Sequence, residues 1–277
     1  MDIKWHDEHE EKPILHRKDS VLWLSFPLLD RENWLTDAFS TRFGGVSRGC
    51  LSSMNLSFAR EPSNGNVLKN FRILSDAVGF SSDNIISTHQ THTTNVRHVG
   101  AADRGSGISK PLPWKNVDGL ITDEPDCVLS VFSADCVPLF FADPVRHAIG
   151  LSHSGWRGTA GRIGSVTVKA MEKDFGTNPK DLLAVIGPSI CMESYEVGEE
   201  TAQFFDGRFL RKKENGKYLL DLWGANRSVL IEAGIPEENI EMPNLCTACN
   251  PDFLFSHRAS HGQRGNMGSF LSIRSKY

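Results

Sequence analysis

The sequence predicts a mixed α/β protein in which helices flank a central, mixed β-sheet in a layered sandwich. Short apolar segments rich in β-branched and aromatic residues cluster in the middle of the chain. Segments with a three- and four-residue apolar spacing precede and follow them, and glycine- or proline-rich turns separate the two kinds. We expect a single domain over residues 20–277, because 277 residues can bury a full core, after a polar leader of residues 1–19.

The first elements are two strands and a helix. Residues 21–29 are apolar, and residues 37–49 run from a strand-like segment into a glycine-rich turn. Residues 64–79 carry their apolar side chains on one helical face and end at Gly79, which predicts a helix with a glycine stop. From residue 85 to residue 99 the pattern is again that of a strand.

The centre of the sheet is expected after the Gly/Ser/Pro-rich stretch of residues 105–113. Its predicted strands are residues 118–122, 128–143 and 147–155. Helices are predicted at residues 159–176, 197–205 and 221–233, and further strands at residues 181–190, 239–242, 253–257 and 268–273. We find no repeat of constant period, which excludes solenoids and propellers.

Composition and charge exclude several classes of protein. The net charge is −4 and the pI is about 6.2, so no positive field attracts nucleic acid, and no apolar run is long enough to span a membrane. The charged N-terminus lacks a secretory signal, which predicts a cytoplasmic protein with reduced cysteines. His6, His9 and His16 lie in the leader, which we expect to be a loosely held, solvated tail. A monomer or a small homo-oligomer is expected.

Three residues are candidates for a reactive centre: His92, Cys136 and His153. These residues are too far apart for a local motif, so only the fold can bring them together. Two imidazoles and a thiolate are a natural zinc set, and with three protein ligands the fourth tetrahedral position stays free, which indicates catalysis. The alternative at this point is a buried cysteine with histidines that are ordinary core residues.

Local segments resemble those of a known family. They are STRFGGVSRGCLSSMNLS, HQTHTTNV, VDGLITDEPDCVLSVFSADCVPLFFADP, HAIGLSHSGWRGTAGRI, IGPSICMESYEVG and CTACNPDFLFSHR. In order, they are similar to the YfiH-like family, whose members are also labelled laccase-domain or polyphenol-oxidase proteins and purine nucleoside phosphorylases of the YlmD type. The resemblance runs from about residue 40 to the end, and ADCVPL followed by HSGWRG is its most specific part.

The resemblance implies a compact α/β sandwich, similar to cysteine hydrolases, with a zinc site made by His92 of a QxH motif, Cys136 and His153; Cu²⁺ is the alternative metal. It also implies phosphorolysis of adenosine, inosine and S-methyl-5′-thioadenosine to the free base and (methylthio)ribose 1-phosphate, with deamination of adenosine. The expected partners are therefore purine nucleosides and phosphate. Copper-dependent phenol oxidation and editing of peptidoglycan precursors are further activities assigned to the family. Thr93, His89 and Asn266 depart from the family pattern, which leaves substrate preference open.

Each candidate residue has an expected role. Cys136 and His153 are predicted to be catalytic, and Arg42 to clamp phosphate through its planar guanidinium. Gln90, Asp135 and Arg157 are predicted to bind or orient substrate, Asp135 by supporting a zinc-ligating histidine. The structural alternatives are a surface ion pair for Arg42 and turn roles for Asp135 and Arg157.

Three competing hypotheses remain. In the first, Cys136 and His153 form a metal-free nucleophilic pair in an amidase-type enzyme that acts on peptidoglycan precursors. In the second, the zinc only stabilises a binding module. A multicopper oxidase needs more histidine pairs than this chain offers. The CxxC of Cys246 and Cys249 has no second pair beside it, so we interpret it as structural.

Overall fold

The computed structural model describes residues 2–7 and 11–275 and contains two six-stranded sheets. In spatial order, the first sheet consists of β1 (Ile14–Lys18), β2 (Val21–Ser25), β3 (Leu35–Ser40), β15 (Met267–Ile273), β7 (Val128–Ser133) and β4 (Ile85–Ser87). The second consists of β14 (Ile240–Glu241), β10 (Leu183–Ile186), β8 (Val137–Asp143), β9 (Ala148–Ser154), β6 (Gly119–Thr122) and β5 (Val96–His98). Both sheets mix parallel and antiparallel pairs.

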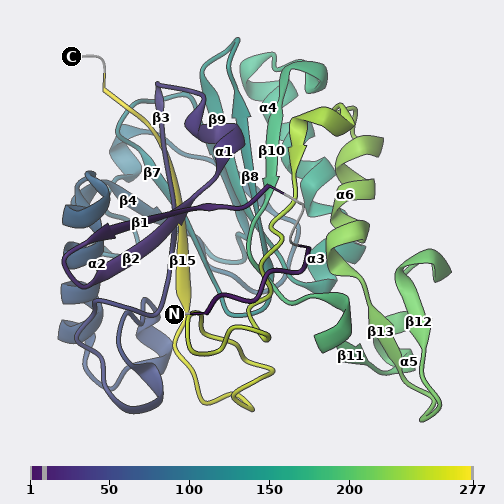
Figure 1. Ribbon diagram of the computed structural model, residues 1–277. Helices are drawn as coiled ribbons and strands as arrows, with labels where there is room; N and C mark the ends of the chain where they lie inside the picture. The colour runs from purple at the N-terminus through teal and green to yellow at the C-terminus, as the bar shows by residue number, and fades with distance from the viewer. Residues whose placement is uncertain (1, 8–10, 276–277) are drawn as a thin grey trace.

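The remaining elements are helices and a small third sheet. The helices are α1 (Pro27–Asp30), α2 (Asn64–Val78), α3 (Trp156–Ala160), α4 (Ile163–Phe175), α5 (Glu199–Ala202) and α6 (Leu222–Glu232). The third sheet has the order β11 (Glu196–Val197), β13 (Tyr218–Leu220) and β12 (Leu210–Lys212), and it projects from one end of the molecule (Figure 1). No helix of the described residues is long and apolar enough to cross a membrane.

The two large sheets stack on each other, with β7 and β15 of the first packing against β9 of the second. The core between them includes Phe26, Phe39 and Phe140, all fully buried. On the outer side of the first sheet lies α2, and on the outer side of the second lie α4 and α6 (Figure 1). The predicted mixed α/β, layered class is confirmed, with two stacked sheets where one central sheet was expected.

The helices are the most accurately predicted elements, and their prediction rests on apolar spacing. Within the predicted residues 64–79, α2 buries Val67, Phe71 and Leu74 and ends at Gly79, whose φ of 104° is left-handed. The stretch of residues 159–176 contains α4 and that of residues 221–233 contains α6. By contrast, residues 197–205 hold only the single turn of α5.

Two predicted strands are interrupted, and both interruptions face the same region. The stretch of residues 85–99 is divided into β4 and β5 by the loop of residues 88–95, and residues 128–143 are divided into β7 and β8 by a turn at residues 134–136. In this turn Asp135 has a left-handed φ of 94°, which no strand can contain. The breaks are the places from which His92 and Cys136 project.

Two further expectations are wrong. Residues 253–257 form turns rather than a strand. The leader is not a loose tail where the structure describes it: residues 14–18 form β1, which pairs antiparallel with β2, and Trp5 bridges to Leu245. His9 lies outside the described residues.

Glu241 gives the fold a pH dependence that a substitution can test. Burial raises the pKa of Glu241 to about 7 from its ordinary value of 4.5, while one oxygen accepts the Leu28 amide at 2.7 Å and the other is buried without a partner among the described residues. Between pH 4.5 and 7 the folded protein therefore keeps a proton that the unfolded chain releases. The contribution of this carboxyl group to the free energy of unfolding is complete below pH 4.5 and is lost as the pH rises through 7.

We expect Glu241→Gln to flatten this dependence. In the native protein the free energy of unfolding should fall by about 1.4 kcal/mol per pH unit across that window because of this one carboxyl group. Urea unfolding of both proteins at several pH values measures the difference. Glu238→Gln, at an exposed neighbouring position, is the control and should leave the slope unchanged. An equal slope in native and Glu241→Gln proteins would contradict the assignment.

Candidate active site

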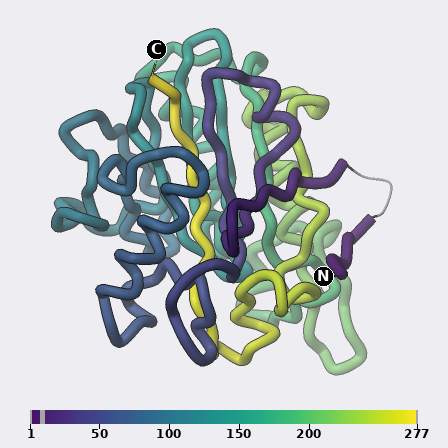
Figure 2. Tube along the Cα trace, turned by 60° about the vertical axis from the view of Figure 1, so that its left-hand side comes forward, coloured from purple at the N-terminus to yellow at the C-terminus, as the bar shows by residue number. Residues whose placement is uncertain are grey.

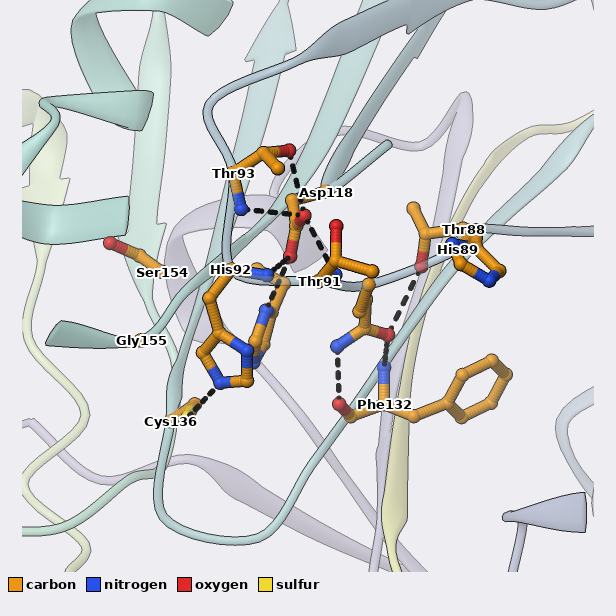
Figure 3. Close-up of polar contacts among 12 residues, drawn as sticks. Thr88, His89, Thr91, His92, Thr93, Asp118, Phe132, Cys136, Ser154 and Gly155 are labelled. Atoms are coloured by element: carbon orange, nitrogen blue, oxygen red, sulfur yellow. Dashed lines mark hydrogen bonds and ion pairs between the residues drawn. The ribbon is translucent and has the colours of Figure 1, made fainter. Parts of the chain in front are cut away.

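A buried carboxylate organises the loop that carries His92. Asp118, fully buried at the start of β6, accepts hydrogen bonds from three consecutive backbone amides, those of Thr91 at 3.0 Å, His92 at 3.1 Å and Thr93 at 2.9 Å. The Thr93 hydroxyl donates a further bond at 2.9 Å. Figure 3 shows the loop curving around this carboxylate, with the His92 ring directed toward Cys136. Because His92 has a left-handed φ of 62°, these bonds stabilise a backbone shape that few residues adopt unaided.

The same carboxylate fixes His153. The Nδ1 atom of His153 lies 2.9 Å from Asp118 Oδ1, and the His153 amide donates to the Asp118 carbonyl at 2.7 Å. Burial alone would raise the pKa of Asp118, but the hydrogen bonds from His153 and the loop amides lower it to about 2. Since Nδ1 faces Asp118, the opposite nitrogen, Nε2, is left for a metal ion or a proton transfer.

Cys136 completes the cluster from the turn before β8. Its Sγ lies 4.0 Å from Nε2 of His92, and the rings of His92 and His153 meet edge to face with centroids 5.0 Å apart. Burial would raise the pKa of Cys136, but the His153 charge and hydrogen bonds from both histidines lower it to about 6. Burial would likewise lower the pKa of His153, yet Cys136 and Asp118 raise it to about 9. Both shifts are in the direction that favours a thiolate–imidazolium pair over the neutral thiol and imidazole.

The donor set fits zinc. One ligand atom each from His92, Cys136 and His153 lies within 4.8 Å of the others, and thiolate with two imidazoles is a usual combination for this ion. The Asp118–His153 pair is the carboxylate–histidine arrangement that orients zinc ligands in many metalloproteins. The three residues also suit Cu²⁺, because imidazole and thiolate bind both metals. With three protein ligands, a tetrahedral ion would keep one position for water or substrate.

Gly155 makes the close approach of the ligands possible. A Cβ at this position would lie 2.8 Å from Cδ2 of His92 and 3.0 Å from Sγ of Cys136, both closer than atoms normally pack. We expect Gly155→Ala to push the ligands apart and to weaken zinc binding by about 10- to 100-fold, the effect of removing a residue that orients a metal ligand. Competition with a chromophoric chelator measures this. Gly207→Ala is the matched control, since its Cβ would meet no atom within 4 Å; equal zinc affinity in the two variants would refute the steric role.

Two cavities meet at the cluster. The larger, of about 440 Å³, is bordered by His92, Cys136 and His153 and by apolar side chains that include Phe132. The smaller encloses about 310 Å³. Its polar lining residues are His92, Asp135, Tyr195, His257, Arg258 and Arg264. Arg264 lines both cavities, so a ligand seated between them would contact it and the cluster together.

Gln90 and Asp135 line these cavities, but their polar atoms bind the protein itself. Gln90 donates to the Phe132 carbonyl at 2.7 Å and accepts the Phe132 amide at 2.8 Å, which ties the histidine loop to β7. Asp135 accepts the Thr247 hydroxyl and the Arg258 amide, both at 2.7 Å. The contact with a histidine of the cluster, which we expected from Asp135, is made by Asp118 instead. Both residues thus shape the cavity walls.

Arg42 and Arg157 are not brought to the site. Arg42 lines neither cavity, because its guanidinium donates to the carbonyls of Ser52 at 2.9 Å and Pro251 at 2.5 Å and stacks on Phe255. The phosphate clamp expected at Arg42 therefore lies outside both cavities, where its guanidinium joins the backbone near Ser52 to that near Pro251. Arg157 is exposed, and its guanidinium lies over the ring of Trp156, 4.2 Å from the centroid. Only Trp156 of that pair lines a cavity.

Two residues of the site, Asp118 and Arg264, are not predicted from the sequence. Asp118 had a usable signal, since a lone carboxylate at the start of the apolar segment DGLIT is costly to bury without partners. Arg264 had a weaker one, as one of several arginines in a polar, glycine-containing stretch. Its placement depends on the path of the irregular residues 253–266, which no periodicity encodes.

Known proteins share this fold and these elements. Residues 36–274 match the family described as multi-copper polyphenol oxidoreductase laccase. The chain is 34% identical over 243 residues to the purine nucleoside phosphorylase YlmD of Bacillus subtilis, covering 85% of this chain and 87% of that protein. It is 37% identical over 252 residues to a purine nucleoside phosphorylase of Deinococcus radiodurans, covering 89% and 93%.

Solved structures agree with these sequence relatives. The crystal structure of YlmD from Geobacillus stearothermophilus superposes with a TM-score of 0.87 at 30% identity, over 95% of this chain and all of that one. The protein YfiH of Bacillus licheniformis superposes with a TM-score of 0.85 at 33% identity, over 94% and 99%. The chain belongs to the laccase-like YfiH/YlmD family, which confirms the resemblance found in the sequence.

Proposed function

We propose that this protein is a zinc-dependent purine nucleoside phosphorylase that acts on adenosine, inosine and S-methyl-5′-thioadenosine and also deaminates adenosine. The observation that carries the proposal is the common border of the two cavities: a zinc-type ligand set and an arginine without a carboxylate partner face the same space. The relatives named purine nucleoside phosphorylases support the same class of enzyme.

Arg264 is the proposed phosphate ligand. It is half-buried, forms no ion pair among the described residues, and has a buried Nε without a hydrogen-bond partner there. Burial, together with the nearby Arg60 charge, lowers the pKa of Arg264 to about 10, so the group remains a cation at neutral pH. A half-desolvated guanidinium is stabilised by an anion, and phosphate matches its planar fork. Arg258, in the wall of the smaller cavity, adds a second positive charge.

The larger cavity suits the purine. Its apolar wall, formed by Phe58, Ile108, Leu112 and Phe132, offers a surface on which a flat heterocycle can pack. His89 and Asn266, two departures from the family pattern, also line this cavity. These departures therefore lie where they would affect the choice between purines.

In phosphorolysis a phosphate oxygen forms a bond to C1′ of the ribose while the C1′–N9 bond breaks, and the electron pair leaves with the purine, which takes up a proton. His92, Cys136 and His153 would hold the zinc ion, which would supply a Lewis acid and lower the pKa of a water molecule for deamination. Arg264 and Arg258 would orient the phosphate, and Asp118 would keep His153 in the tautomer that presents Nε2.

Two alternatives are less well supported. The clusters of possible metal ligands among the described residues contain at most two histidines, fewer than a multicopper centre uses. The Cys136–His153–Asp118 arrangement also resembles a metal-free nucleophilic triad, with a low thiol pKa. An amidase would then be active in the presence of a chelator.

The test is incubation of zinc-loaded protein with each nucleoside, with and without phosphate and with and without chelator, followed by separation of adenine, hypoxanthine and inosine. We expect the free base to form only when phosphate is present, and inosine to form from adenosine when phosphate is absent. Chelator should abolish both reactions. Absence of base and of inosine in the loaded sample would overturn the proposal. Chelator-resistant amide hydrolysis, or phenol oxidation by copper-loaded protein in place of nucleoside turnover, would identify the competing activities.

Arg264→Met tests the phosphate ligand separately. Loss of the guanidinium should raise the KM for phosphate by about 10- to 100-fold, the effect of about 1.4–2.8 kcal/mol of lost charged hydrogen bonding, and leave zinc content unchanged. Steady-state kinetics with phosphate as the varied substrate measure it. Arg274→Met, an exposed arginine bonded to Thr36 and the Asn33 carbonyl, is the control. An unchanged KM for phosphate would exclude Arg264 from the anion site.

A further inference from the structure

A second group of thiols lies outside the active site. Cys191 follows the loop after β10, and Cys246 and Cys249 form the CxxC of the segment at residues 244–250. One sulfur from each lies within 4.8 Å of the other two, and Cys191 and Cys249 are 3.9 Å apart. Cys191 and Cys246 are buried, and Cys249 is half-buried. The partner that the CxxC lacked in the sequence is thus Cys191, which lies 55 positions before Cys246.

The N-terminal segment crosses this thiol group and holds a histidine beside it. The side-chain amide of Asn250 accepts from the Lys4 amide at 2.8 Å and donates to the Lys4 carbonyl at 3.0 Å. The His6 amide donates to the Asn244 carbonyl at 3.1 Å, and the His6 ring packs edge-on against Trp223. These contacts bring a ring nitrogen of His6 within 4.8 Å of the Cys191 sulfur.

We infer that Cys191, Cys246, Cys249 and His6 form a second zinc site, separate from the catalytic cluster. Three thiolates and one imidazole make the closed, four-ligand set that structural zinc sites use, in contrast to the open set of the active site. Binding of Zn²⁺ would displace the three thiol protons and leave the complex with one negative charge. The Glu193 carboxylate, 4.0 Å from Nδ1 of His6, is placed to orient that ring.

A hydroxyl group lies beside all three sulfurs. Ser194 Oγ is 3.6 Å from the sulfur of Cys191, 4.0 Å from that of Cys246 and 3.5 Å from that of Cys249. A hydroxyl in this place can donate a hydrogen bond to a thiolate ligand and so stabilise the negative charge of the zinc-bound state.

The position of this second site connects it to the active-site wall. The Thr247 amide donates to the Ser189 carbonyl at 3.0 Å, and its hydroxyl donates to Asp135 at 2.7 Å. The Ile190 amide donates to the Asp135 carbonyl at 3.0 Å. The metal would join the N-terminal segment, residues 189–194 and residues 244–250 into one unit (Figure 2), and this unit holds the residue next to Cys136.

The experiment uses the full chain, stripped of metal and reloaded with Zn²⁺ alone. In a Cys136→Ala background, which lacks the catalytic site, we expect one zinc per chain by elemental analysis. In that background zinc should also protect Cys191, Cys246 and Cys249 from alkylation, measured for each cysteine by mass spectrometry. The exposed Cys50 is the internal control and should react equally with and without zinc. Because the readouts are metal content and thiol protection, the result is independent of any nucleoside activity.

Two variants in the Cys136→Ala background complete the test. Cys249→Ser should bind no zinc, and His6→Ala, which changes a half-exposed side chain and should fold normally, should bind zinc at least about tenfold more weakly. Zinc-free Cys136→Ala protein with unprotected thiols, or zinc-independent formation of a disulfide among the three cysteines, would overturn the site. Unchanged zinc affinity of the folded His6→Ala variant would overturn the fourth ligand.

Discussion

Cys136→Ala should lower the zinc content by one equivalent per chain and reduce nucleoside phosphorolysis by about a thousandfold or more. Cys136 is the only proposed ligand in the catalytic cluster that carries a negative charge when it binds metal, so its loss leaves two neutral imidazoles, one of them exposed. The size of the effect follows from losing the electrostatic stabilisation that a metal gives to developing charge, which is commonly the largest single contribution.

Elemental analysis and product separation measure the two effects on the same preparation. Cys50→Ala is the matched control, because Cys50 is exposed and lines neither cavity. It should retain zinc and activity. Full phosphorolysis by a Cys136→Ala protein that has lost one zinc equivalent would show that the catalytic metal is not needed for this chemistry. Full zinc content in that variant would remove Cys136 from the ligand set.

Asp118→Asn should damage both the site and the fold. Asp118 now accepts four hydrogen bonds from the loop and shares a fifth with Nδ1 of His153. An asparagine has one acceptor oxygen where the carboxylate has two, and its NH₂ group would face some of these donors without being able to accept from them. Leaving such buried groups unpaired costs about 1–3 kcal/mol each, so we expect the free energy of unfolding to fall by about 3 kcal/mol.

Asp118→Asn should also weaken zinc binding and catalysis. His153 loses the partner that sets its tautomer, and we expect zinc affinity to fall about 10- to 100-fold and kcat/KM by about 10²- to 10⁴-fold. Chelator competition, kinetics and urea unfolding separate the three quantities. Asp123→Asn, an exposed carboxylate near His98, is the control. A folded Asp118→Asn protein with native zinc affinity would exclude the positioning role.

The predictability of the site differs from ligand to ligand. Cys136 precedes β8 and His153 lies near the end of β9, and the two strands pair antiparallel with Pro138 opposite His153. Their 17-residue separation is therefore the length of a β-hairpin, which the apolar segments and the DPVRH turn already indicate. The position of His92 has no such local basis. It depends on a loop whose shape is determined by a carboxylate 26 positions away.

The errors in the predicted fold have a related cause. Apolar spacing predicted α2, α4 and α6 because each buries one face against a sheet. It joined β7 to β8 because only residues 134–136 separate two strongly apolar segments. It left out β1, whose strand pairing compensates for mostly exposed side chains. The leader was interpreted as solvated from its charge, whereas backbone hydrogen bonds to residues 244–250 hold its first residues. Pairing between distant backbones leaves little trace in side-chain composition.

The unequal anchoring of the three ligands determines how metal should leave the active site. His153 belongs to β9, which is fully buried and bonded to a strand on each side, so its amides should exchange with solvent water only when the whole domain unfolds. His92 is exposed on a loop, and the amides of residues 91–93 in this loop all donate to the single carboxylate of Asp118. Dissociation of the ion should accordingly begin with His92 swinging outward, and the lifetime of the bound metal becomes a measure of how often that loop opens.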